Sequence, residues 1–324
     1  MHSGEWAEAM LEDITAHAPV PNLSVKLGLY NDIDVSLPLS EICDRAVLAV
    51  KSIKHDYKRP YASYDGAVSQ QLYKAQMLEA RFHSALKNKE FVVWYQPKFE
   101  PVHKTLLGAE ALVRWKQKDG RIMPPGEFLP VFEKDGLIGQ LDAYVFEEVC
   151  IFQQFCLSEG IPVLPVSVNL SRSSIFGKDI VERYQKIADQ YNVPVSCVPI
   201  EITESAFIRS SEVKPVADAF VKAGFELHMD DFGSGRSSLN GLNVLPFSEV
   251  KFDKSLIDYI GDAQGDKVLK HTMALMDDLG LRTIAEGVET EAQKEFLIQC
   301  GVDGIHGYLF AKPMEESEYL KLLQ

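Results

Sequence analysis

From residue 91 onward, apolar runs of strand length alternate with stretches of helical periodicity. Short apolar runs bounded by turn residues fit buried strands, while apolar positions that recur every three or four residues fit helices. The runs predict strands at residues 91–96, 108–114, 163–169, 198–202, 226–230, 249–253, 282–286 and 304–309. Helices are predicted between them at residues 137–156, 180–191, 213–223, 267–279 and 291–299.

This alternation indicates an α/β fold. Eight strands and their helices over roughly 230 residues suit a (β/α)8 barrel, whose usual size is about 250 residues. A doubly wound open sheet has the same alternation, so periodicity alone leaves both architectures open.

The first part of the chain has a different rhythm. It predicts a helix near residues 6–16, a strand near 23–30 and an amphipathic helix at 38–54, which are too few elements to bury a core on their own. A helical stretch over about residues 69–87 follows. We therefore expect a small α/β segment at residues 1–66, a linker helix at 67–86 and a barrel at 87–324.

Composition narrows the classes of protein. No apolar run is long enough to span a membrane, and the acidic N-terminus is not a signal peptide. We expect a cytoplasmic location, either alone or as the cytoplasmic part of a larger, membrane-anchored protein. The five cysteines form no CxxC pair, which indicates free thiols. A net charge of −14 argues against binding a nucleic acid polymer.

Polar side chains follow one predicted strand after another. In a barrel these strand ends meet at one face, and charged groups so close to a core are costly unless they are paired or coordinated. The residues are Glu110, Arg114, Asn169, Glu201, Asp230, Asp231, Lys251, Asp253 and Glu286. They predict a functional site at this face.

The residue types indicate a metal site. Carboxylates and one amide oxygen, with no cysteine, suit Mg²⁺ or Mn²⁺ rather than Zn²⁺. Two such ions about 3.5–4 Å apart can share a bridging carboxylate and hold both reacting oxygens of a phosphodiester. The adjacent Asp230 and Asp231 fit this arrangement if Asp231 lies where the strand gives way to a loop, because strand side chains alternate between faces.

Eight short motifs then identify a family. They are residues 95–97 (YQP), 108–115 (GAEALVRW), 168–171 (VNLS), 201–205 (EITES), 230–238 (DDFGSGRSS), 251–253 (KFD), 285–290 (AEGVET) and 307–310 (GYLF). Over residues 87–324 the chain resembles the EAL family of cyclic di-GMP phosphodiesterases. This resemblance implies a modified barrel with one antiparallel strand and the hydrolysis of cyclic di-GMP to linear pGpG.

The resemblance also implies a role for each matching residue. The implied metal ligands are Glu110, Asn169, Glu201, Asp230 and Asp231, with Asp230 bridging two ions. The implied catalytic residues are Lys251, which would orient the attacking water, Glu286, which would act as general base or second-site ligand, and Glu204, which would anchor the loop at 231–238. The implied substrate contacts are Gln96, Leu112, Arg114, Asp253 and His306.

Two positions depart from the family. His306 stands where glutamine is usual, and Arg236 stands in the loop where an aromatic residue is common. These differences bear on rate and metal preference more than on binding.

Residues 1–66 resemble the back end of a GGDEF domain without its front half or its signature. We therefore expect a piece of a longer protein, which does not synthesise cyclic di-GMP. The expected partners are cyclic di-GMP and a second copy of the chain, because family members often dimerise. No membrane contact is expected in this segment.

The leading hypothesis is a metal-dependent phosphodiesterase. The alternative is a catalytically inactive cyclic di-GMP receptor, and a third reading is a scaffold that binds only protein. The complete metal and base set favours the enzyme. Structural explanations remain for single residues: Glu110 and Arg114 could pair along one strand, and His228 is expected to be a core or helix-facing residue. Asn169 could cap the next helix, as Ser171 or Ser173 could equally.

Overall fold

Eight strands close into a ring in the part of the chain that the structure describes. The computed structural model describes residues 3–17, 25–31, 33–53, 56, 59–177, 179–234 and 239–324. Around the ring the strand order is β3, β11, β10, β9, β8, β7, β6 and β4, and β4 pairs with β3 to close it. β3 is antiparallel to both neighbours, and the other ring pairings are parallel. The predicted barrel with one reversed strand is confirmed, and the open sheet is excluded.

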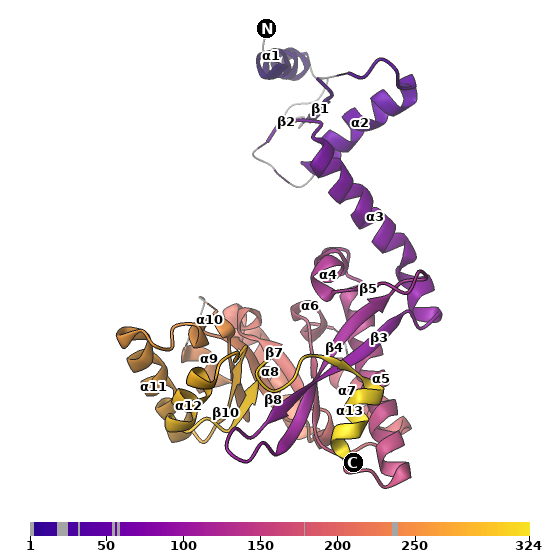
Figure 1. The fold of residues 1–324 in the computed structure, drawn as a ribbon. Helices are drawn as coiled ribbons and strands as arrows, with labels where there is room; N and C mark the ends of the chain where they lie inside the picture. The colour runs from indigo at the N-terminus through magenta and orange to yellow at the C-terminus, as the bar shows by residue number, and fades with distance from the viewer. Residues whose placement is uncertain are drawn as a thin grey trace. The chain divides into compact units, whose positions relative to one another are not determined.

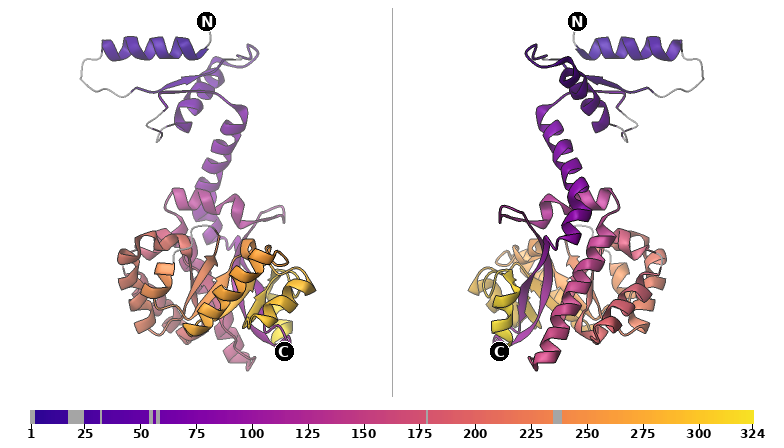
Figure 2. Two further views of the ribbon diagram at one scale, coloured as in Figure 1. Left: turned by 90° about the vertical axis from the view of Figure 1, so that its left-hand side faces the viewer. Right: turned by 90° about the vertical axis from the view of Figure 1, so that its right-hand side faces the viewer.

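Helices lie around the outside of the strands (Figures 1 and 2). The ring strands are β3 (Phe91–Phe99), β4 (Leu106–Lys116), β6 (Val166–Asn169), β7 (Ile200–Thr203), β8 (Leu227–Phe232), β9 (Glu249–Phe252), β10 (Arg282–Glu286) and β11 (Gly304–His306). The short strands β5 (Ile122–Met123) and β12 (Met314–Glu315) extend the sheet beside β4 and β3. The α-helices of this part are α4 (Leu129–Lys134), α5 (Ile138–Glu159), α6 (Arg172–Ile175), α7 (Ile180–Gln190), α8 (Ser210–Lys222), α9 (Leu239–Val244), α10 (Lys254–Ile257), α11 (Ala263–Asp278), α12 (Glu291–Gln299) and α13 (Glu316–Leu323).

The chain divides into two compact units, Met1–His83 and Ser84–Gln324. The first unit holds α1 (Ser3–Ala16), β1 (Leu27–Leu29), α2 (Leu39–Ser52) and β2 (Tyr61–Ser63), and α3 (Gly66–Lys87) crosses the boundary. β1 and β2 form a parallel pair. A Cβ at Gly28 would lie 1.9 Å from the carbonyl oxygen of Ala46, so only glycine lets α2 pack this closely on β1. Residues 23 and 24 of the predicted strand lie outside the described residues.

Local sequence signals set several helix ends. Thr290 and Gln293 form a capping box at the start of α12, as polar residues at these spacings favour. Gly160 ends α5 with a φ of 66°, a conformation that glycine adopts without strain. The predicted helices of the barrel are confirmed, and α12 has the predicted bounds.

The barrel interior contains a column of buried charged side chains. Along β9, Val250 and Phe252 are fully buried with the apolar core, while Lys251, between them on the opposite face, points into the barrel. The buried charged or titratable residues of the interior, each at most 8% exposed, are Lys98, Glu110, Glu201, His228, Asp230, Glu249, Lys251 and His306. Such groups require partners, and these partners define the site.

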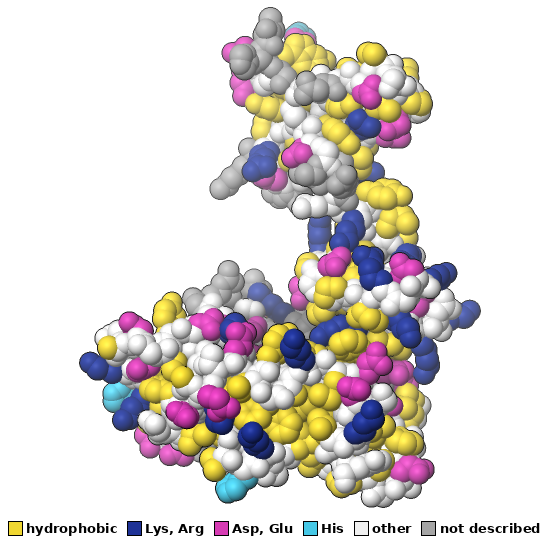
Figure 3. Space-filling model, in the orientation of Figure 1, with side chains coloured by type: hydrophobic (Ala, Val, Ile, Leu, Met, Phe, Trp, Pro, Cys, Tyr) yellow, Lys and Arg dark blue, Asp and Glu magenta, His cyan; other side chains and the backbone are white. Residues whose placement is uncertain are grey.

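Among the described residues, none of the helices combines the length and the apolar character that crossing a bilayer requires. Acidic and basic side chains are interspersed over the visible face of this unit in Figure 3.

Candidate active site

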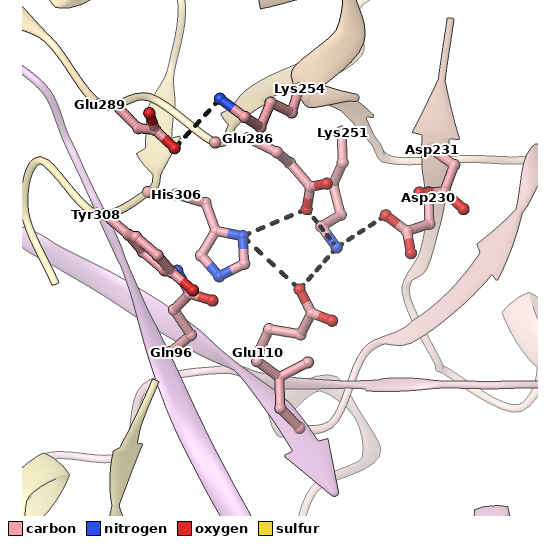
Figure 4. Close-up of a pocket in the computed structure, with 13 residues that line it drawn as sticks. Gln96, Glu110, Asp230, Asp231, Lys251, Lys254, Glu286, Glu289, His306 and Tyr308 are labelled. Carbon is pink, nitrogen blue, oxygen red and sulfur yellow. Dashed lines mark hydrogen bonds and ion pairs between the residues drawn. The ribbon is translucent and has the colours of Figure 1, made fainter. Parts of the chain in front are cut away.

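Lys251 lies at the centre of the polar interior, and four carboxylates surround its ammonium group. Its Nζ lies 2.9 Å from Glu110, 2.7 Å from Glu201, 2.9 Å from Asp230 and 2.8 Å from Glu286. Several of these side chains are drawn around it in Figure 4. They come from β4, β7, β8 and β10, and Lys251 comes from β9. The structure therefore brings these strand-end residues to one place.

One lysine cannot neutralise so many carboxylates. Burial lowers the pKa of Lys251, but the surrounding carboxylates, Asp230 first, raise it well above its usual value. Burial raises the pKa of Asp230 well above its usual range, and the neighbouring glutamates add to this, although Lys251 opposes it. For Glu286, the charges of Lys251 and His306 outweigh burial and lower the pKa to about 2. The raised pKa of Asp230 means that this carboxylate takes up a proton more readily than usual, and a bound cation would offset the same excess of negative charge.

Two groups of donors converge closely enough to hold a metal ion. Glu110, Glu286 and His306 form one group, and Asp230, Asp231 and Glu286 form the other, with the donor atoms of each group within 4.8 Å of one another. Carboxylate-rich sets of this kind suit hard divalent cations. The residues present therefore fit a metal site, and Glu286 belongs to both groups.

Asp231 reaches this site through an irregularity inside β8. The strand pairing with β9 shifts register between Met229 and Phe232, and Asp231 has a φ of 58°. This local break in the alternation lets both adjacent aspartates face the cavity, which they line together. The sequence predicts that Asp231 lies in the loop after the strand. In the structure Asp231 lies within β8, and the irregularity there lets its side chain share a face with that of Asp230.

Asn169 supports the carboxylate of Glu110. Its Nδ2 donates a hydrogen bond of 2.8 Å to Oε1 of Glu110, and on the strand pair β6–β7 it lies opposite Glu201. The helix that follows, α6, is capped by Ser171, whose side chain accepts a hydrogen bond from the backbone of Ser174. The reading of Asn169 as a helix cap is therefore wrong.

A cavity of 520 Å³ opens above these groups. Gln96, Leu112 and His306 line it, as expected for substrate contacts, and Lys254 and Tyr308 also line it. His306 Nδ1 lies 3.3 Å from Glu286 and its ring faces the acidic cluster in Figure 4. This volume is of the size that small-molecule sites usually have.

Two expected substrate contacts lie elsewhere. Arg114 places its guanidinium 5.5 Å from the ring centre of Trp94 and donates a hydrogen bond to the carbonyl of Val113. Glu110 attracts Arg114 from a distance, and no close ion pair between the two is formed among the described residues. Asp253 caps α10 by accepting a hydrogen bond from the backbone of Ser255. Neither Arg114 nor Asp253 lines the cavity.

Glu204 lies at the base of the loop after β8. It is 5% exposed, and its Oε2 accepts a hydrogen bond of 3.4 Å from the backbone of Gly233. This contact joins Glu204 to the loop, as the resemblance implies. Residues 235–238, which include Arg236, lie outside the described residues.

The sequence reasoning missed several polar residues of the interior and the rim. Lys98 is buried inside the barrel, and Lys254 forms an ion pair of 3.2 Å with Glu289 at the cavity rim. The alternation of β3 could have indicated Lys98, because it lies two residues after Gln96 on the same strand face. His228, expected to be a core residue, lies in the interior with its Nδ1 at 3.1 Å from Glu249.

The chain matches a known domain family and several named proteins. The EAL domain family matches residues 79–313. The bifunctional diguanylate cyclase/cyclic di-GMP phosphodiesterase MucR of Pseudomonas aeruginosa is 31% identical over 86% of this chain and 41% of its own length. The cyclic di-GMP phosphodiesterase RocR of the same organism is 32% identical over 72% of this chain and 60% of its own length. The chain therefore spans less than two thirds of these relatives.

A solved structure has the same fold. It is described as the PaMucR phosphodiesterase in complex with c-di-GMP, is 33% identical, and superposes with a TM-score of 0.71. The match covers 75% of this chain and 99% of that one.

Proposed function

The chain belongs to the EAL-domain family, and from this premise we propose that it hydrolyses cyclic di-GMP to linear pGpG in the cavity beside Lys251. The observation that carries the proposal is the convergence of carboxylates from four strands on one buried lysine. Such a concentration of negative charge is stable only with cations, and a phosphodiester needs cations for its own charge.

The metal ligands in this proposal are Glu110, Asn169, Glu201, Asp230 and Asp231. Bound Mg²⁺ or Mn²⁺ would polarise the phosphodiester and lower the pKa of a water molecule. The membership of Glu286 in both donor groups supports a ligand role over that of a general base.

Lys251, which is buried beside the proposed metal ligands, would act on the substrate. Its ammonium group keeps its proton, and if the carboxylates that share its three N–H donors turned to bound metal ions, it could donate a hydrogen bond to the attacking water or to a phosphate oxygen. Charge that develops on phosphate oxygens is stabilised best by donors that are already fixed in place. The buried position of Lys251 on β9 supports this role.

Gln96, Leu112 and His306 would contact the nucleotide from the cavity wall. Arg114 would have to leave Trp94 to place its guanidinium on a phosphate. Asp253 would act mainly through the start of α10, which it caps. Glu204 would hold the loop after Asp231 through the backbone of Gly233.

A receptor without hydrolysis is the second candidate, and one observation favours it. His306 Nδ1 lies 3.3 Å from Glu286 and 3.7 Å from Glu110, so a protonated imidazole would occupy the carboxylates that a metal needs. The histidine replaces the glutamine that is usual at this position, and a glutamine carries no positive charge.

We also propose that residues 1–66 are a partial GGDEF-like segment, that residues 67–86 form a linker helix, and that residues 87–324 are the EAL barrel. The parallel β1–β2 pair with α2 packed on it is compatible with part of an α/β domain. In this proposal the chain acts in the cytoplasm and forms a homodimer.

The deciding experiment is turnover of cyclic di-GMP, followed by chromatography with Mg²⁺, Mn²⁺, Ca²⁺ or EDTA. We expect linear pGpG with Mg²⁺ or Mn²⁺, none with EDTA, and none from Glu110→Ala. Nucleotide binding without turnover would favour the receptor, and His306→Gln would then be expected to restore hydrolysis. Full activity of Glu110→Ala would contradict the metal site.

A further inference from the structure

Glu201 is held from two sides by two different lysines. Its Oε1 lies 2.8 Å from Nζ of Lys98, and its Oε2 lies 2.7 Å from Nζ of Lys251. Glu201 is completely buried, so neither oxygen can exchange its partner for bulk water. One oxygen therefore faces Lys251 and the carboxylates around it, and the other faces Lys98.

Lys98 reaches this position because β3 runs in reverse. On the paired strands Gln96 lies opposite Glu110, whereas Lys98 lies opposite Gly108, nearer the start of the parallel strands. Gln96 lines the cavity, and Lys98, two residues later on the same face, points below the carboxylates. An all-parallel barrel would present these two side chains in the opposite order.

The ammonium group of Lys98 has a complete set of partners. It has three N–H donors, and three acceptors surround it: Glu201 at 2.8 Å, the hydroxyl of Ser167 at 3.0 Å and Glu249 at 3.4 Å. No donor is left for a substrate. Lys98 can therefore affect chemistry only through the groups that it holds.

Lys251 cannot fix Glu201 in the same way. It has the same three donors but four carboxylates within 2.9 Å, so its hydrogen bonds are shared among them. Of the two lysines, Lys98 is the partner of Glu201 that does not depend on how the carboxylates lining the cavity are occupied, and His228 Nδ1 also lies 3.9 Å from the same Oε1. Burying a second ammonium group is costly, which argues for a specific use of Lys98 beyond filling the core.

We propose that Lys98 is a positioning residue that fixes Oε1 of Glu201 and so presents Oε2 alone to the metal ion. This inference rests on the proposed metal site. Partners of this kind orient metal ligands, and their loss typically weakens metal binding about 10- to 100-fold. Lys98 thereby sets the direction and the number of donor atoms that Glu201 offers.

Metal binding by the full chain tests this role directly. Mn²⁺ is titrated calorimetrically into metal-free wild type, Lys98→Met, Glu249→Gln and the double variant Lys98→Met/Glu249→Gln. The double variant removes one positive and one negative charge, so the buried net charge stays as in wild type. We expect both variants that lack Lys98 to bind Mn²⁺ about 10- to 100-fold more weakly, and Glu249→Gln to bind within about threefold of wild type.

Kinetics provide the second readout. In Lys98→Met the Mn²⁺ concentration for half-maximal turnover should rise with the Mn²⁺ dissociation constant, while KM for cyclic di-GMP at saturating Mn²⁺ changes less than about threefold. Normal Mn²⁺ affinity in the double variant would overturn the proposal, as would equal losses in Glu249→Gln and Lys98→Met. Unfolding of the double variant would also overturn it, because the barrel rather than Glu201 would then require Lys98. Absence of Mn²⁺ binding by wild type would instead contradict the metal site itself.

Discussion

At the scale of single residues, Lys251 is the group on which the other charges depend. Lys251→Met should lower the free energy of unfolding in EDTA by about 3–5 kcal/mol, because it leaves buried carboxylates without their partner. It should also abolish measurable turnover. Urea unfolding in EDTA and in Mn²⁺ measures the effect, and Mn²⁺ should stabilise the variant more than the wild type. Equal stability of both proteins in EDTA would contradict this account of the charge cluster.

Asp231 combines an acidic side chain with a left-handed backbone, at a φ of 58°. Asparagine tolerates this conformation and alanine does not, so Asp231→Ala should be about 1 kcal/mol less stable than Asp231→Asn. Both variants should lose most activity, because each lacks the carboxylate. Denaturant unfolding and turnover of the two variants separate the backbone effect from the chemical one. Activity retained in Asp231→Asn would remove this residue from the metal site.

The sequence predicts residue identities at the site better than residue contacts. The motifs indicate Glu110, Glu201 and Asp230 as ligands, and the structure brings them together. Arg114 does not line the cavity, because its guanidinium lies over the ring of Trp94 on the neighbouring strand. This contact depends on how the two strands pair, and the periodicity of a single strand does not predict that pairing.

At the scale of elements, the close approach of β4 to β6 depends on Gly108. It has a φ of 156°, and a Cβ there would lie 2.3 Å from the carbonyl oxygen of Pro165. Gly108→Ala should lower the free energy of unfolding by about 1–3 kcal/mol more than Gly120→Ala. Gly120 is the matched control, because it also has a positive φ of 85° but no atom within 4 Å of the added Cβ.

Chemical denaturation of the two glycine variants measures this difference. Turnover should also fall in Gly108→Ala alone, because the β4–β6 pair sets Glu110 beside Asn169. Equal stability of the two variants would show that the positive φ, and not the contact between strands, determines the cost.

The barrel strands and the longer helices could be predicted from the sequence, and the short helices could not. Strands and helices with several apolar positions show the hydrophobic periodicity of their type, and their predicted positions agree with the structure. Helices α6 and α10 have four residues each and no period of their own. Their starts are marked only by the capping side chains of Ser171 and Asp253, and the sequence analysis assigned Asp253 to substrate contact instead.

At the scale of the whole molecule, acid stability should depend on the lower end of the buried charge column. Burial raises the pKa of Glu249, but the charges of Lys98 and His228 outweigh it and lower the pKa from 4.5 to about 2. A lowered pKa stabilises the fold above pH 4.5, and this contribution is lost as the pH falls toward 2. At about 1.4 kcal/mol per pKa unit, the contribution is roughly 3 kcal/mol.

Glu249→Gln should therefore be less stable than wild type near neutral pH, and the difference should shrink as the pH falls below about 4.5. Urea unfolding at a series of pH values measures it. Glu318→Gln on α13 is the control, because that side chain is 63% exposed. A difference that stays constant with pH would show that Glu249 does not carry the lowered pKa.

The reversed strand β3 also bears on how the chain folds. β3 and β4 are adjacent in sequence and pair as an antiparallel hairpin over residues 91–99 and 106–116, a local contact that an all-parallel barrel lacks. Local pairs lose little loop-closure entropy and form within microseconds, whereas the pairing of Phe99 with Ile305 joins distant parts of the chain. The hairpin can therefore form as an early nucleus, with ring closure by β11 as the late event, so substitutions in β11 should accelerate unfolding more than they slow folding.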